Sequence, residues 1–301
     1  MSLLPDPTVI GDVAAPPFVR LPDPLALFAA RARRYRALAD GHPLSPYLHY
    51  LAALSVCQHR LQDGLPEPEM PSAAARAQAR DHGMPPLDRS RFTADAALET
   101  TLNRLFALAV EIDMPDAARG ALARCRDADA VVRDGMMRAV MADAIPIETL
   151  ADHVYVAAAL QVHFVRMTAR LDGISLVPVG DGACPACGGA PSSSMIVGWL
   201  GAHGVRFCAC ALCATLWHVV RVKCVICGST EGIAYQELDA GPAAVKAETC
   251  ERCQGYVKIL HQHKDPALDP VADDVATLGL DLLLRENGYQ RGSANPFLLG
   301  Y

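Results

Sequence analysis

Eight of the eleven cysteines in this chain stand in four Cys-x-x-Cys pairs within one short stretch. The pairs are Cys184/Cys187, Cys210/Cys213, Cys224/Cys227 and Cys250/Cys253. Adding 40 to each position of the first two pairs gives the last two, and Gly188 and Gly228 follow the first pair of each half. Two Cys-x-x-Cys turns complete a tetrahedron around one ion, with metal–sulfur bonds of about 2.3 Å. The register therefore predicts two copies of one four-thiolate metal module.

Four thiolates around one ion suit zinc or a rubredoxin-type iron. Disulfides are the main alternative, but residues 1–19 carry no Lys or Arg before their apolar residues, unlike a secretory signal. We therefore expect a cytoplasmic, reducing compartment, where disulfides are rare. Thioredoxin-like redox pairs open a helix in a βαβ unit. The flanks here are Gly, Pro and short β-type runs such as residues 217–222, which disfavours that alternative.

The spacing leaves the assignment of pairs to ions open. The duplication favours a sequential arrangement, in which each half is a self-contained ribbon with its own ion, over an interleaved one. Cys208 could replace a ligand or be a reactive thiol, or it could be a strand residue pointing the same way as Cys210. Cys57 and Cys125 lie in Ala-rich stretches expected to be helical, and we predict that they are small buried apolar residues.

Three histidines lie within or just after the modules: His218, His261 and His263. Histidine is a frequent metal ligand. Because eight cysteines already fill two sets of four, we expect these histidines beside the sites or in solvent instead. Trp217 and Tyr256 either pack over the cysteine turns or serve as anchors for a partner.

Charge and apolar content disfavour two classes of protein, nucleic-acid-binding and membrane-spanning ones. The chain has 301 residues, a net charge of −6 and a pI of about 5.9. Residues 184–264 contain seven Lys or Arg against five Asp or Glu, too small a surplus for a nucleic-acid-binding zinc ribbon. No uncharged apolar run reaches the roughly 18 residues of a membrane span. We therefore expect no nucleic-acid partner and no membrane span, and homo-oligomerisation stays open.

The pattern of apolar residues predicts an α+β chain in five parts. They are a Pro-rich tail or docked arm (1–22), a helical domain (23–175), the first four-cysteine module (176–222), the second (223–268), and a C-terminal docking helix with a tail (269–301). Within the helical domain the expected helices cover 24–38, 45–61, 98–110, 114–126, 129–143 and 148–171, the last of them central and buried. Residues 64–86 are expected to form a loop bearing Pro and Gly, with a short Ala-rich piece at 72–81.

A single helix is expected over residues 269–288. Asp269 can cap its start, and Asn287-Gly288 gives an end signal. Its apolar face should dock on another part of the chain. Asp273 and Asp274 in its first turn either form an acidic partner site or, as we favour, complement the positive end of the helix dipole.

From Cys184 onward the chain resembles the formate dehydrogenase accessory proteins of the FdhE type. The stretches that carry the resemblance are Cys184-Pro-Ala-Cys-Gly188, Arg206-Phe-Cys-Ala-Cys-Ala-Leu-Cys213, Arg221-Val-Lys-Cys-Val-Ile-Cys-Gly228, Glu248-Thr-Cys-Glu-Arg-Cys253, Tyr256-Val-Lys258, Ala272-Asp-Asp274, Leu280-Asp-Leu282 and Asn295-Pro-Phe-Leu298. Upstream, residues 36–43 and 159–161 are also similar. Cys208 departs from the family pattern, which commonly has one cysteine there.

The resemblance implies a cytoplasmic maturation factor or chaperone that binds the catalytic subunit of respiratory formate dehydrogenase before export. It implies no catalysis by the chain itself. It also implies rubredoxin-like iron at the cysteine turns, so we expect two metal ions per chain, iron rather than zinc. A plain zinc-ribbon scaffold and a thiol or iron redox protein are the alternatives.

Overall fold

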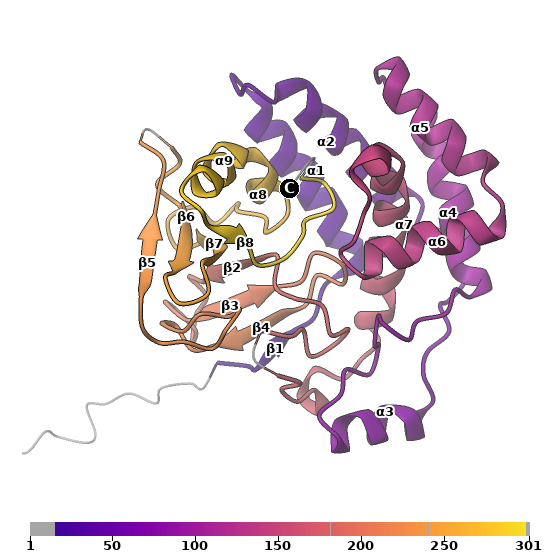
Figure 1. Cartoon of the computed structure of the whole chain (residues 1–301). Helices are drawn as coiled ribbons and strands as arrows, with labels where there is room; N and C mark the ends of the chain where they lie inside the picture. Colours follow the sequence, from indigo (N-terminus) through magenta and orange to yellow (C-terminus); the bar gives the residue numbers. More distant parts are fainter. Residues whose placement is uncertain (1–15, 181, 240, 299–301) are drawn as a thin grey trace, which may run out of the picture.

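The computed structural model describes residues 16–180, 182–239 and 241–298. Helices fill the first half of this described chain, and strands followed by short helices fill the second (Figure 1). This confirms the predicted α+β class, with two four-cysteine clusters in the β region. Within the described ranges, no helix combines the length and the apolar character that crossing a bilayer requires.

The helical region is built around one buried helix. Its helices are α1 (Pro24–Ala39), α2 (Ser45–Arg60), α3 (Ala73–Asp81), α4 (Ala96–Ala109), α5 (Asp116–Asp127), α6 (Ala130–Met141) and α7 (Leu150–Thr168). Asp23, Asp95 and Asp129 begin α1, α4 and α6 by accepting a backbone N–H in the first turn. Nearly every side chain of α7 is buried, because α1, α2, α4, α5 and α6 all pack against it. The expectation of a central buried helix is confirmed.

Helix α3 differs from the others because none of its residues is buried. It lies at the edge of the molecule (Figure 1), with Ser72 capping its start. Short 3-10 turns occur at η1 (Ile147–Thr149) and η2 (Gly173–Ser175). Helix α3 therefore contributes little to the core.

The strands of both cysteine modules form one sheet together with β1 (Val19–Arg20) and β8 (Gln290–Arg291), which lie outside the modules. The module strands are β2 (Ser193–Ile196), β3 (Arg206–Ala209), β4 (Leu216–Val219), β5 (Ile233–Gln236), β6 (Val245–Cys250) and β7 (Gly255–His261). The order is β1-β4-β3-β2-β7-β6-β5, with β8 added on β7. The junction is a parallel pairing of β2 with β7, in which Ser193 faces Lys258. The two modules are therefore not separate ribbons in their strands, because each alone would leave one edge of its inner strand, β2 or β7, unpaired.

The C-terminal helix docks as expected but is broken in two. It consists of α8 (Ala272–Ala276) and α9 (Leu278–Glu286). Asp269 caps its start by accepting the N–H groups of Val271 and Ala272. The break falls at Thr277, since the buried Lys258 ammonium of β7 takes the carbonyls of Asp274 and Thr277.

Buried ion pairs hold this C-terminal segment in place. Arg31 and Arg34 of α1 pair with Asp269 and Asp273, at 3.1 and 2.6 Å. A second group contains two cations and two carboxylates: Lys258, Asp274 and Asp281, which are completely buried, and Arg291, whose side chain is 10% exposed. Burial raises the pKa of Asp274, but the two cations outweigh it and keep that pKa below its ordinary value. An exposed acidic partner site at positions 273 and 274 is therefore excluded.

Candidate metal centres

The eight paired cysteines converge in two groups of four. In each group the four Sγ atoms lie within 4.8 Å of one another. The first group contains Cys184, Cys187, Cys210 and Cys213, and the second contains Cys224, Cys227, Cys250 and Cys253. We call them the first and second centre. The grouping is sequential, as the duplicated register favours, and not interleaved.

The spacing of the sulfurs fits a tetrahedral metal site. A tetrahedron with metal–sulfur bonds of about 2.3 Å has sulfur–sulfur edges of about 3.8 Å. In the first centre Cys184–Cys213 and Cys187–Cys210 are 3.5 and 3.6 Å apart. In the second centre the corresponding pairs are both 3.8 Å apart. Both centres therefore have the size that a four-thiolate zinc or iron ion requires.

The two modules repeat each other in backbone detail. We call residues 184–188 the first knuckle and residues 224–228 the second. In each knuckle the residue after the second cysteine is a glycine with positive φ, 80° at Gly188 and 75° at Gly228, and its N–H donates to the carbonyl of the first cysteine. Glycine adopts this conformation without strain. The other turns match too, with φ of 55° at Ala214 and 53° at Gln254.

A loop from the helical region covers the first centre. The N–H of Leu87 donates to the carbonyl of Ala186 at 2.9 Å, and the N–H of Arg89 donates to the carbonyl of Cys187 at 3.1 Å. We call residues 85–89 the covering segment. Its Leu87 side chain is buried, and all four cysteines of the centre are at most 4% exposed. The first centre is therefore closed to solvent.

The second centre has no such cover among the described residues. Cys227 is exposed and Cys253 is partly exposed, while Cys224 and Cys250 are buried. The N–H of Ser229 lowers the pKa of Cys227 to about 7. Ile226, between the two cysteines of the knuckle, is 38% exposed. One side of this centre thus faces solvent.

The remaining candidate ligands lie outside both centres. Cys208 is completely buried in β3, and burial raises the pKa of its thiol to about 12, so it is neither a ligand nor a reactive thiolate. Cys57 and Cys125 are buried as expected. His218, His261 and His263 belong to neither cluster found in the described chain.

The two aromatic residues in question are core residues. Trp217 is 3% exposed and faces Cys208 across the β3–β4 ladder. Tyr256 is 2% exposed, packs with Leu280 and Leu284, and donates its hydroxyl to Asp281. A role as partner anchors is therefore wrong for both.

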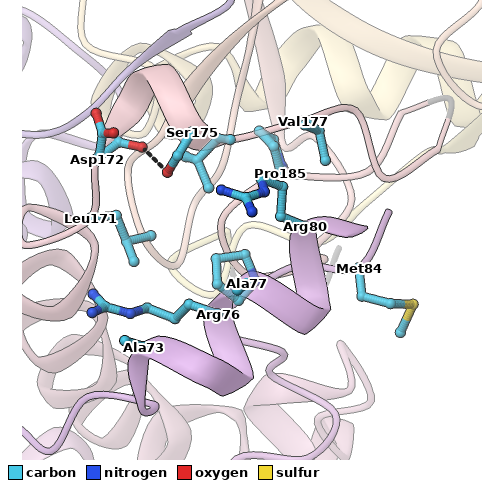
Figure 2. Close-up of a pocket in the computed structure, with 12 residues that line it drawn as sticks. Ala73, Arg76, Ala77, Arg80, Met84, Leu171, Asp172, Ser175, Val177 and Pro185 are labelled. Atoms are coloured by element: carbon cyan, nitrogen blue, oxygen red, sulfur yellow. Dashed lines mark hydrogen bonds between the residues drawn. The ribbon is translucent and has the colours of Figure 1, made fainter. Parts of the chain in front are cut away.

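Sequence reasoning missed the covering segment. Residues 85–89 fall in a stretch rich in proline and glycine that has no apolar period, and nothing local in it points to a chain region 100 residues away. The only hint is Pro85-Pro86, which stiffens the chain ahead of Leu87. A cavity of about 240 Å³ lies beside the covering segment. Figure 2 shows Arg80 of α3 close to Pro185 of the first knuckle in its lining.

The chain matches known proteins over nearly its full length. Three family models match in order: FdhE, N-terminal (residues 16–181), FdhE, central domain (183–221), and FdhE, C-terminal domain (222–298). The "Protein FdhE homolog" of Rhizobium meliloti (strain 1021) is 48% identical over 299 residues, which cover 99% of this chain and 98% of the relative. The homolog of Edwardsiella ictaluri (strain 93-146) is 36% identical over 281 residues, 92% of this chain and 90% of the relative.

A solved structure is similar as well. The crystal structure of the FdhE protein from Pseudomonas aeruginosa aligns with a TM-score of 0.83 at 34% sequence identity. The alignment covers 95% of this chain and 99% of that chain. Fold and sequence similarity therefore extend over the helical region and both cysteine modules.

Proposed function

Because this chain belongs to the FdhE family, we propose that it is a non-catalytic accessory protein that binds the catalytic subunit of formate dehydrogenase. It would act in the cytoplasm and support assembly or activation of that enzyme before export. The observation that carries the proposal is the full-length family match together with two four-cysteine sites. Four-thiolate sites of this kind leave no open coordination position for a substrate.

We further propose that each four-cysteine centre binds one metal ion, two per chain, and that the ion is iron in preference to zinc. The spacing of the sulfurs supports tetrahedral binding of either ion. Bound iron would supply one-electron exchange without a change of ligands. Metal analysis and absorption spectra of anaerobically purified protein test this part, and two zinc ions per chain would refute the choice of iron.

The accessory role is tested in a strain deleted for this gene. We expect loss of formate dehydrogenase activity, restored by the chain itself but not by a variant with Cys184→Ser and Cys187→Ser. A Cys57→Ser variant controls for loss of a thiol outside the centres. Normal activity in the deleted strain, or failure to capture the catalytic subunit with this chain, would refute the proposal.

A second candidate function is one-electron transfer to or from the same partner. The observation that favours it is the exposure of Cys227 and Cys253, because an exposed thiolate ligand brings a donor or acceptor close to the ion. A reversible redox transition that disappears in Cys227→Ser, while the first centre keeps its metal, is the expected result. The absence of any reversible transition in the iron-loaded protein would exclude this candidate.

A further inference from the structure

Among the described residues, a segment from outside the modules donates main-chain hydrogen bonds to the first knuckle and not to the second. On the first knuckle, the covering segment donates the N–H groups of Leu87 and Arg89 to the carbonyls of Ala186 and Cys187. Pro85 packs on the outer side, since a Cβ at Gly188 would lie 3.1 Å from its Cγ. A knuckle of this type therefore binds two N–H groups of alternate residues in one short segment.

The second knuckle offers the same two acceptors. By the 40-residue register, Ala186 corresponds to Ile226 and Cys187 to Cys227. The internal hydrogen bonds of the two knuckles are the same, from Cys184 to Gly189 in one and from Cys224 to Ser229 in the other. Within the described part of the chain, no main-chain N–H donates to the carbonyl of Ile226 or Cys227.

We propose that the second knuckle is a docking site for a short basic segment of a partner protein, bound through alternate main-chain N–H groups to the carbonyls of Ile226 and Cys227. The chain's own covering segment cannot be this occupant, because it already binds the first knuckle. The exposure of Ile226 and Cys227 leaves this site open to another molecule.

The covering segment indicates the chemistry of the occupant. Leu87 is 3% exposed, so the first donor residue should be apolar. Burial lowers the pKa of Arg89, two residues later, but the ion pair with Asp143 raises it more, and the thiolates of Cys187 and Cys210 raise it further. Four thiolates with a divalent ion carry a charge of about −2. The occupant should therefore carry an apolar residue followed, two positions later, by arginine or lysine.

The two knuckles differ in the space that they leave for the basic side chain of a bound segment. A Cβ at Gly189 would lie 3.1 Å from Nη1 of Arg89, so glycine lets the guanidinium lie against the backbone. The corresponding position in the second module is Ser229. We therefore expect the occupant's cation to lie further out, over the exposed side of Cys227.

A synthetic peptide of residues 83–92 is the probe, and the zinc-loaded full chain labelled with ¹⁵N is the target. Because the first knuckle is covered in cis, the peptide should bind the second. We expect saturable chemical-shift changes at Ile226, Cys227 and Gly228. Methylating the peptide nitrogen at the Leu87 or Arg89 position should weaken binding about tenfold or more, as loss of a hydrogen bond does.

Methylation at the Asp88 position is the matched control, because the N–H of Asp88 makes no hydrogen bond in the described structure. This peptide should bind as the parent does. A protein variant, Ile226→Lys, should also lower affinity up to about fivefold through repulsion of the basic residue. Val222→Lys adds the same charge at another exposed apolar position and should leave affinity unchanged.

Three results would overturn the proposal: no saturable binding, equal binding of all methylated peptides, or chemical-shift changes confined to the first knuckle. If Ile226→Lys loses zinc, the methylated peptides alone decide. The inference does not depend on which protein supplies the segment, so loss of the formate dehydrogenase assignment would leave it standing.

Discussion

The difference in exposure between the two centres predicts two very different rates of metal loss. When an excess of a chromogenic chelator is added to the two-zinc protein, the second centre should lose its ion first, because Cys227 and Cys253 are accessible. The chelator reaches the first centre only after the covering segment detaches from the first knuckle. The slow rate therefore measures the free energy of that local opening.

The size of this free energy follows from the contacts of the covering segment. Its two main-chain hydrogen bonds contribute about 1 kcal/mol each. Burial of the Leu87 side chain contributes about 2 kcal/mol. Since 1.4 kcal/mol corresponds to a factor of ten, a total of about 4 kcal/mol predicts a ratio of about 1,000 between the two rates.

Stopped-flow absorbance should show one zinc released in each of two phases, and Cys227→Ser should lack the fast phase. Leu87→Ala should accelerate the slow phase about thirtyfold, from loss of about 2 kcal/mol of burial. Leu122→Ala is the matched control, since Leu122 is equally buried but lies in α5. Release of both ions in one phase, or a slow phase that Leu87→Ala leaves unchanged, would refute the reasoning.

Three further predictions concern stability and metal content. Lys258→Met should lower the free energy of unfolding by about 3–5 kcal/mol in urea titrations, because it leaves buried carboxylates short of one cation; the partly exposed Lys246→Met should cost about 1 kcal/mol or less. Burial lowers the pKa of His163 to about 4, so stability should fall by about 3 kcal/mol as the pH drops from 6.5 to 4, since only the unfolded chain takes up the proton. As the pH falls from 6.5 to 4, the urea midpoint of His163→Gln should therefore rise relative to that of the wild type. If the midpoints of both proteins change in parallel with pH, the effect does not come from His163. Cys208→Ala should retain two metal ions by elemental analysis, and loss of one would make Cys208 a ligand after all.

Sequence patterns alone were enough to predict the cysteine turns, several helices and the buried central helix, because short-range interactions determine these features. The 40-residue register anticipates which four sulfurs converge, because identical spacing demands identical backbone turns. The start of α1 was predicted from Asp23-Pro24, and α4 was predicted from its apolar face alone, two residues short of its start at Ala96. Apolar residues all round residues 154–160 likewise predicted a buried helix.

The features that sequence reasoning missed all depend on distant contacts. The break at Thr277 arises because Lys258, 19 residues earlier, competes for helix carbonyls. The pairing of β2 with β7 joins strands that no turn connects. The difference between the two centres comes from residues 85–89, about 100 positions upstream of the knuckle they cover. No window of sequence around the cysteines contains this information.

The parallel β2–β7 junction also sets an order of events during synthesis. The first centre has all its ligands once Cys213 has been made, but β2 must wait for β7, which ends at His261, 48 residues later. At about 5–20 residues per second, the edge of β2 stays unpaired on the ribosome for roughly 2–10 s. An ion already bound in the first centre would hold the β2–β3 hairpin in register as the template for β7. Metal starvation during growth should therefore act on the newborn chain, through edge-to-edge aggregation, more than on the finished protein.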